Sequence, residues 1–164
     1  MVSMHERCVR SYPQLLFFAL IIMCRVYHVS YAYAFFGYIG NTIANGALKQ
    51  GFRRVIGDAG NRPVPHHPKT AFDTAIVAIW PQYKNNNAYG FPSGHAQSVG
   101  YFVAFVYQFL PWRTWHPAWI AAALSIALML MWSRVVYRRH TATQVLFGFA
   151  FGIAFFRAFH LFFN

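Results

Sequence analysis

The sequence contains few charged residues and almost no acidic ones. Charged residues occupy 10% of the 164 positions, whereas soluble domains carry roughly 25%. The three acids are Glu6, Asp58 and Asp73, and this scarcity argues against a soluble globular protein. Cysteine is scarce as well. Cys8 and Cys24 stand alone, so the chain has neither a disulfide framework nor a cysteine-based metal motif.

Hydrophobic residues, in contrast, are abundant. They make up 57% of the chain, and aromatic residues make up 20%, which excludes intrinsic disorder. The 14 Lys and Arg residues give a net charge of +11, a balance that often indicates nucleic acid as a partner. Here the basic residues are scattered between long uncharged runs. We therefore expect a membrane bilayer as the partner and no nucleic acid.

Four uncharged runs approach the length of a bilayer span, which is about 20 residues. They cover residues 26–48, 95–112, 117–133 and 141–156, and a shorter run covers residues 13–24. The pattern predicts an all-α fold, a polytopic transmembrane helical bundle of about five helices that forms a single domain over residues 1–164. Buried helices of a soluble protein are the alternative, but they would leave too little polar surface.

The amino terminus allows a second interpretation. Arg7 and Arg10 precede an apolar run that ends at Ala32-Tyr33-Ala34, and this pattern resembles a cleavable signal peptide. Cleavage there would leave the first long run too short to cross a bilayer.

One long polar loop, residues 49–94, lies between the first and second long runs. Its prolines and asparagines are typical of loops, and a loop of this length in a compact domain is usually functional. An apolar piece, residues 71–80, predicts a short interfacial helix. In the last run, Gly148 and Gly152 form a pair that lets helices approach closely, so we expect them to pack inside the bundle.

The order of the spans places two distant segments on the same membrane face. Two crossings separate the loop at residues 49–94 from the segment at residues 133–140. Both therefore lie on one face, which we call the active face. The polar residues expected there are Arg53, Arg54, Arg62, Ser93, His95, Arg134 and His140.

This set of side chains suits phosphate chemistry. Arginine binds phosphate oxygens through paired hydrogen bonds. The turn Pro92-Ser93-Gly94 precedes a predicted helix, whose N-terminal N–H groups and dipole favour an anion. One imidazole can attack phosphorus while a second protonates the leaving oxygen. The residues therefore predict phosphoryl transfer, with fixed positive charge in place of a metal. The spacing of His66 and His67 fits no metal site.

Three short segments resemble the signatures of the type 2 phosphatidic acid phosphatase superfamily, a family of lipid phosphatases. They are Arg62-Pro63 with a basic residue upstream, Pro92-Ser93-Gly94-His95, and Ser133-Arg134 followed after five residues by His140. The signature region covers residues 45–152. Within it, residues 89–97 and 133–148 resemble the dolichyl diphosphatase branch, including Gln144 where most of the superfamily has Asp.

The resemblance implies a role for each residue. His140 would attack phosphorus and form a phosphohistidine, His95 would protonate the leaving group, and Gln144 would hold the His140 ring. Phosphate oxygens would be bound by Arg62, Arg134, Ser93, Gly94 and either Arg53 or Arg54. The substrate would be a lipid diphosphate, namely a polyprenyl (dolichyl) diphosphate, in the endoplasmic reticulum membrane. No metal, no cofactor and no obligate protein partner are implied.

Departures from the family pattern keep alternatives open. The spacing between Arg62 and the upstream basic residue differs from the family's. Arg53 and Arg54 are therefore equal candidates, and Lys49 lies further upstream. Val64 stands where the family has a second arginine, and the chain offers about five helices where the family has six. One alternative is another lipid phosphate as substrate, such as phosphatidate or a sphingoid phosphate. The other is a non-catalytic membrane protein with a degenerate lipid phosphatase fold.

The membrane orientation of the active face is also open. The order of the spans puts 11 of the 14 Lys and Arg residues on that face, and the positive-inside rule then predicts a cytoplasmic face. Several of these residues are predicted phosphate ligands, which biases the count. Enzymes of the dolichyl branch act on the lumenal face, so the resemblance favours the lumenal side.

Overall fold

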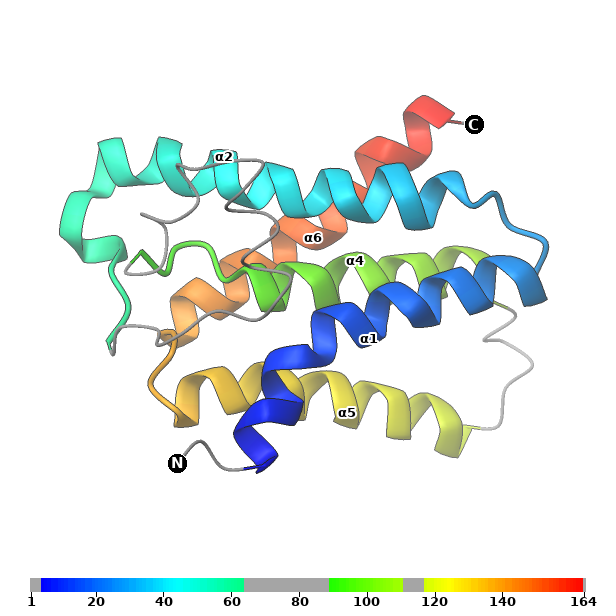
Figure 1. The fold of residues 1–164 in the computed structure, drawn as a ribbon, viewed down its shortest axis with the longest axis horizontal. Coiled ribbons are helices and arrows are strands. Elements are labelled where there is room, and N and C mark those ends of the chain that lie inside the picture. Colours follow the sequence, from blue (N-terminus) through cyan, green and yellow to red (C-terminus); the bar gives the residue numbers. More distant parts are fainter. Residues whose placement is uncertain (1–3, 64–88, 111–116, 164) are drawn as a thin grey trace.

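Five α-helices form the described part of the computed structural model, which covers residues 4–63, 89–110 and 117–163 (Figure 1). They are α1 (Met4–Val26), α2 (Ile39–Ile56), α4 (Gly94–Phe109), α5 (Pro117–Val136) and α6 (Ala142–Phe163). Within these residues the strand-like pairing is limited to one bridge, between Asn61 and Tyr89. The predicted all-α fold with about five helices is confirmed for this part of the chain. The predicted interfacial helix at residues 71–80 lies outside the described residues.

The first long uncharged run does not form the helix predicted over residues 26–48. α1 ends at Val26, and the chain turns at His28, whose φ is 55°. A π-helix, η1 (Tyr33–Tyr38), then runs directly into α2, which continues to Ile56. The predicted span is wrong at both ends for two reasons. A run of uncharged residues does not reveal a turn within it, and a single charge does not stop a helix.

The other runs form helices close to their expected positions. The short run at residues 13–24 belongs to α1, which has 23 residues. α4 begins at Gly94, directly after the predicted turn. α6 extends past Arg157 to Phe163. After α2, Gly57 adopts a φ of 51°, a backbone conformation that glycine tolerates best, and the 3-10 turn η2 (Gly57–Gly60) reverses the chain.

α6 is the one helix of the described part that is both long and apolar enough to cross a bilayer. The mean hydropathy of its most apolar stretch of 18 residues is 1.8, and 22% of that stretch is buried. The comparable apolar parts of α1 and α5, Pro13–Val26 and Ile120–Val136, are shorter. Membrane crossing by α6 and by the other predicted spans stays a prediction.

α4 and α6 make the most extensive contact between helices, and glycines allow it. A Cβ at Gly148 would meet the carbonyl of Ser93, and a Cβ at Gly152 would meet the carbonyl of Gln97. On the α4 side, a Cβ at Gly100 would meet a backbone carbonyl of α6. The predicted packing of Gly148 and Gly152 inside the bundle is therefore confirmed.

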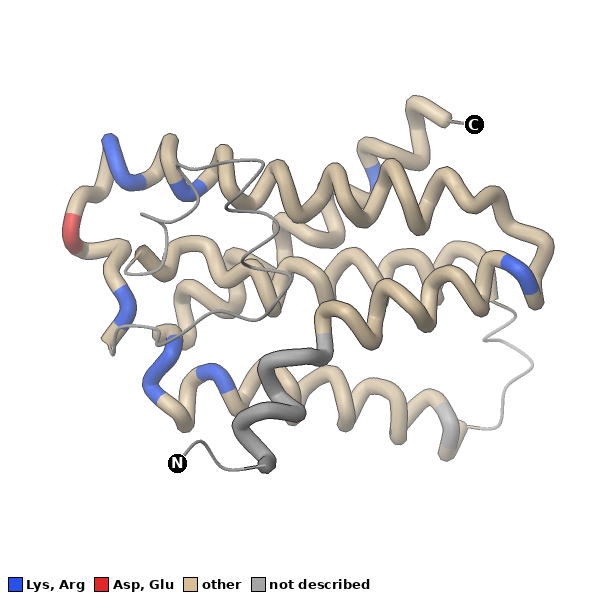
Figure 2. The backbone as a smooth tube through the Cα atoms, viewed as in Figure 1, with Lys and Arg blue, Asp and Glu red and all other residues tan. Residues whose placement is uncertain are grey.

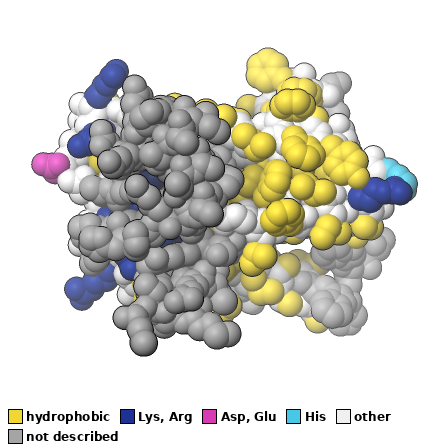
Figure 3. Space-filling view, viewed as in Figure 1, with side chains coloured by type: hydrophobic (Ala, Val, Ile, Leu, Met, Phe, Trp, Pro, Cys, Tyr) yellow, Lys and Arg dark blue, Asp and Glu magenta, His cyan; other side chains and the backbone are white. Residues whose placement is uncertain are grey.

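The hydrophobic core lies towards the end of the bundle where α1 ends and η1 begins. Its buried residues include Tyr33, Tyr101, Phe105 and Phe156, and the Tyr101 hydroxyl donates to the Tyr33 carbonyl at 2.7 Å. Around this core, large apolar side chains are exposed on every described α-helix. Figure 3 shows them on the right-hand part of the visible face, beside the grey atoms, with basic side chains towards both ends. Such broad apolar exposure is unusual for a soluble monomer.

Candidate active site

Basic residues gather at one end of the bundle (Figure 2). This is the end at which α2 and α5 finish and α4 and α6 begin (Figure 1), and we call it the basic end. It carries Lys49, Arg53, Arg54, Arg62, Arg134, Arg138 and Arg139, whereas Arg25 lies in the last turn of α1 at the other end and Arg157 lies in the second half of α6. The helix starts that carry His95 and His140 belong to the basic end as well. The structure therefore brings the predicted site residues to a common end of the molecule.

The end of α5 positions His140. Arg138 N–H donates to Val135 O at 2.9 Å, and Arg139 N–H donates to Arg134 O at 3.0 Å. Arg138 has a φ of 51°. These two bonds and the left-handed residue form a Schellman motif, a common way to end a helix. His140 N–H also donates to Arg134 O at 3.0 Å, so the reversal holds His140 beside Arg134.

Gln144 forms the first turn of α6 and contacts His140. Thr141 and Gln144 make a capping box, in which Gln144 N–H donates to Thr141 Oγ1 and Thr141 N–H donates to Gln144 Oε1, both at 3.2 Å. The amide nitrogen of Gln144 donates to Gly60 O at 3.1 Å and to Asn61 O at 3.0 Å. Both amide hydrogens are thus used on carbonyls, which fixes the amide orientation.

The orientation of Gln144 determines the tautomer of His140. Gln144 Oε1 lies 3.2 Å from His140 Nδ1. An amide oxygen can only accept a hydrogen bond, so Nδ1 must carry the hydrogen. In the neutral ring, Nε2 then carries the lone pair. The predicted pairing of His140 with Gln144 has this geometry, although His140 precedes α6 and does not share a helical face with Gln144.

His140 is buried among positive charges. Its side chain is 2% exposed, and burial is the main cause that holds the pKa of His140 well below its usual value of 6.5. The charges of Arg62, Lys49 and Arg134 lower this pKa further, in that order, because each repels an imidazolium. The hydrogen bond to Gln144 raises the pKa but does not offset the other effects. The ring is therefore neutral near neutral pH.

Lys49 is a site residue that the sequence motifs missed. It is 5% exposed and acts on His140 electrostatically. Arg53 and Arg54, the residues predicted to fill this role, are exposed. A signal for Lys49 was present, since Asn41, Asn45 and Lys49 recur at intervals of four residues and are all buried. This interval marks one face of a helix.

Arg62 is held where the segment at residues 60–62 meets the segment at residues 89–90, next to Gln144. Gly90 N–H donates to Gly60 O at 2.8 Å, and Arg62 Nε donates to Tyr89 O at 3.4 Å. The segments pack tightly, because a Cβ at Gly90 would lie 2.9 Å from Arg62 Cγ and 2.5 Å from Gln144 Oε1. The two loop segments thus hold Arg62 close to Gln144 and His140.

The turn before α4 provides the second half of the site. Ser93 is the N-cap of α4, and its hydroxyl accepts a hydrogen bond from Ala96 N–H at 3.4 Å. Ser93 N–H donates to Gln144 O at 2.9 Å, which ties the start of α4 to the first turn of α6. The first N–H groups of α4, those of Gly94 and His95, have no carbonyl of their own helix to bond and favour an anion. His95 lies within this first turn.

A buried amide network supports this turn from α2. The Asn45 amide nitrogen donates to Pro92 O at 3.4 Å and to Gln97 Oε1 at 2.8 Å. The Gln97 amide nitrogen donates in turn to Asn41 O and Asn41 Oδ1 at 2.8 and 2.9 Å. Asn45 Oδ1 would lie 2.9 Å from a Cβ at Gly94, so glycine is required for this close approach. The network fixes the turn relative to Lys49, one helical turn along α2.

The family model of the PAP2 superfamily matches residues 30–164, a range that contains every predicted site residue. The chain belongs to the PAP2 superfamily. No curated protein and no solved structure matches the chain. The predicted superfamily is thus confirmed, and the dolichyl diphosphatase branch stays a prediction.

Members of the PAP2 superfamily are phosphatases, and membership indicates a phosphatase that acts on lipid phosphates. The site of this PAP2 member combines a neutral imidazole with three cations, Lys49, Arg62 and Arg134, and with the N-terminus of α4. In the described part of the chain, no group of three or more His, Cys, Asp or Glu side chains is placed to hold a metal ion. His66 and His67 lie outside the described residues.

Proposed function

We propose that this PAP2 member is an integral membrane hydrolase that removes the terminal phosphate of a polyprenyl diphosphate, with dolichyl diphosphate as the physiological substrate. One observation carries the proposal. The Gln144 amide orients the His140 ring so that Nε2 holds the lone pair, and the charges of three cations act on that ring. A neutral nucleophile among fixed positive charges matches the requirements of phosphoryl transfer.

The proposed reaction has two steps. His140 Nε2 attacks the terminal phosphorus, and the bond from phosphorus to the bridging oxygen breaks. The bridging oxygen takes a proton from His95 and leaves as the polyprenyl monophosphate. Water then attacks the phosphohistidine and gives a proton to His95, and the electron pair of the phosphorus–nitrogen bond returns to Nε2. Inorganic phosphate is released and both histidines regain their starting states.

The fixed cations stabilise both transition states. Charge on the transferring phosphoryl oxygens is met by Lys49, Arg62 and Arg134, which replace the charge that a metal ion supplies in other phosphatases. Ser93 and the backbone N–H of Gly94 add hydrogen bonds at the start of α4. The hydrogen bond from Ser93 N–H to Gln144 O links the anion site at the start of α4 to the helix start beside the nucleophile. We expect turnover to persist in the presence of a chelator, without a cofactor and without a protein partner.

The membrane location is part of the proposal. α6 is long and apolar enough to cross a bilayer, and large apolar side chains are exposed along the other helices. A polyprenyl tail would lie in the hydrocarbon layer while its diphosphate meets the basic end at the level of the headgroups. The resemblance to the dolichyl branch supports the endoplasmic reticulum membrane and a multi-pass topology.

The test is to trap phosphate on His140. The purified protein in detergent is mixed briefly with a polyprenyl diphosphate that carries ³²P in its terminal phosphate, and is then quenched in base. We expect an alkali-stable, acid-labile label on the peptide that contains His140, and no label in His140→Asn. His160→Asn, at the other end of α6, is the matched control and should label like wild type. A labelled His140→Asn protein, or a turnover that EDTA abolishes, would contradict the proposed mechanism.

A further inference from the structure

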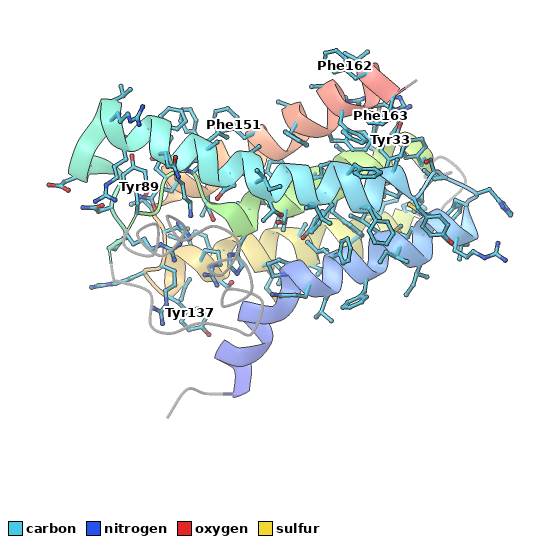
Figure 4. The ribbon with its side chains drawn as sticks, turned by 45° about the horizontal axis from the view of Figure 1, so that its top comes forward. Tyr33, Tyr89, Tyr137, Phe151, Phe162 and Phe163 are labelled. Carbon is cyan, nitrogen blue, oxygen red and sulfur yellow. The ribbon has the colours of Figure 1, made fainter. Side chains whose placement is uncertain are left out.

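Four phenylalanines form a continuous aromatic surface, which we call the aromatic wall. Phe52 contacts Phe91 and Phe151 with ring centroids 4.8 and 6.0 Å apart. Phe147 contacts Phe91 and Phe151 at 5.1 and 6.5 Å. The rings come from α2, from the segment before α4 and from α6. Figure 4 labels Phe151, which lies where α6 passes α2.

The wall lies directly beside the proposed phosphate site. Phe52 follows Lys49 by three residues on α2, and Phe147 follows Gln144 by three residues on α6. Side chains three residues apart on a helix are neighbours. Phe91 comes two residues before Ser93. Three elements that build the phosphate site therefore each contribute a phenylalanine to the wall, one turn or less away.

The wall is open on one side. Phe91 is 8% exposed and forms its base, whereas Phe147 is 48% exposed, and Phe52 and Phe151 are partly buried. An exposed aromatic surface next to a charged site is suited to an amphipathic ligand. Its charged end would occupy the site, and its apolar part would cover the rings.

We propose that the aromatic wall binds the first hydrocarbon units of the substrate tail and thereby selects an isoprenoid chain. This inference rests on the proposed function, because it takes the terminal phosphate to lie at His140. In a polyprenyl diphosphate, the atoms that follow the phosphates are methyl-branched hydrocarbon, which loses no hydrogen bond against aromatic rings.

Other lipid phosphates do not match the wall. A glycerolipid carries ester carbonyls a few atoms from the phosphate, and a sphingoid phosphate carries an amine and a hydroxyl there. Placed against phenylalanine rings, these polar groups would lose their hydrogen bonds to water without replacement, which is unfavourable. The wall therefore favours an isoprenoid tail over a glycerolipid or sphingoid backbone.

A cross-linking experiment tests where the tail lies, independently of turnover. The probe is a prenyl methylenebisphosphonate, which is not hydrolysed, with a benzophenone attached to the first prenyl unit. We expect the label on the peptides that contain Phe147 and Phe151, and we expect excess farnesyl diphosphate to compete with it. Label near Phe162, at the far end of α6 (Figure 4), or label that resists competition, would overturn the proposal. Label that resists competition would mean that the probe associates with apolar surface in general.

A kinetic experiment tests selection by the tail. For Phe147→Ala, kcat/KM is measured with farnesyl diphosphate and with methyl diphosphate, which lacks a tail. We expect the ratio of the two values to fall about tenfold, since a phenylalanine contact is lost only with the tailed substrate. Phe162→Ala, whose side chain is 89% exposed on the same helix, should keep the wild-type ratio. An unchanged ratio in Phe147→Ala would overturn the proposal that the aromatic wall binds the tail. A wild-type protein that hydrolyses neither diphosphate would instead overturn the proposed function.

Discussion

At the scale of single residues, Gln144 orients the ring of its neighbour His140. Its oxygen accepts from His140 Nδ1 and its nitrogen donates to the carbonyls of Gly60 and Asn61. A carboxylate in this place would have no hydrogen to donate to those carbonyls. It would also stabilise the imidazolium, whereas a neutral amide orients the ring without adding charge. The hydrogen bond to Gln144 raises the pKa of His140, but burial and the charges of Arg62, Lys49 and Arg134 lower it further, so the ring stays neutral.

The role of Lys49 can be tested through the pH dependence of activity. We expect Lys49→Met to lower kcat/KM roughly 100-fold, because one cation that faces the transferring phosphoryl group is lost. The charge of Lys49 also lowers the pKa of His140. Its removal should raise that pKa towards the ordinary value, so the acid limb of kcat/KM should move to higher pH. The measurement is a kcat/KM profile from pH 4 to pH 8.

Arg53→Met is the matched control for Lys49→Met. It removes a positive charge one helical turn further along α2, where the side chain is exposed. We expect less than about a threefold change in kcat/KM and no movement of the acid limb, because charges in water are screened. An equal loss in both variants would mean that the basic end acts through its total charge and that Lys49 has no special position.

Motifs predicted some site residues and missed others. The His140–Gln144 pair and the turn before α4 were found because their chemistry lies in consecutive or closely spaced residues. Lys49 was missed because its position in the site depends on the continuation of α2 beyond residue 48. The spacing of residues in a motif does not reveal where a helix ends. Thr141-x-x-Gln144 is a capping-box pattern, so the start of α6 could have been predicted from the sequence.

At the scale of elements, the crossing of α4 and α6 holds the two halves of the site together. We expect Gly152→Ala to destabilise the protein by roughly 1–3 kcal/mol, since its new methyl group would meet backbone atoms of Gln97 and Tyr101, which a rotamer change cannot relieve. Activity should fall as well, because the crossing joins Ser93 to Gln144. Thermal unfolding in detergent, followed by intrinsic fluorescence, measures the first effect.

Gly51→Ala is the control for this crossing. Gly51 lies within α2, and a Cβ there would have no atom within 4 Å. Alanine costs less conformational entropy than glycine in a helix, so we expect a gain of about 0.5–1 kcal/mol. A destabilised Gly51→Ala would show that glycine-to-alanine changes disturb this protein regardless of packing. A neutral Gly152→Ala would show that the crossing can open without cost.

Helix positions were predictable where the sequence has strong boundaries. Pro117 opens α5, Ser93 caps α4 and the capping box opens α6. At each of these boundaries a residue type that favours a helix start marks the position in the sequence. The boundary between α1 and η1 has none that hydropathy detects, because residues 27–31 include Tyr27, Val29 and Tyr31. In the structure α1 ends just before a left-handed residue, His28, with a hydrogen bond from Val29 N–H to Cys24 O at 3.0 Å.

At the scale of the whole molecule, the arrangement of ends predicts a topology. α2 and α5 both end at the basic end, whereas α1 ends at the opposite end beside Arg25 (Figures 1 and 2). If the apolar middle lies in a bilayer, the two ends must face opposite compartments. Single cysteines at exposed positions can report this, in a background of Cys8→Ser and Cys24→Ala. We expect Arg54→Cys and Arg138→Cys to react with an impermeant maleimide from one side of sealed vesicles, and Arg25→Cys and Arg157→Cys to react from the other.

The same labelling decides the orientation of the basic end. The excess of Lys and Arg there would make it cytoplasmic under the positive-inside rule. The positive-inside rule applies to charges that are exposed beside the membrane. Lys49 and Arg134 are buried and act electrostatically on His140, so they do not count towards the orientation. A lumenal basic end would therefore mean that these charges serve the site. Reaction of all four positions from the same side would contradict a spanning bundle, and the chain would then lie on one membrane surface.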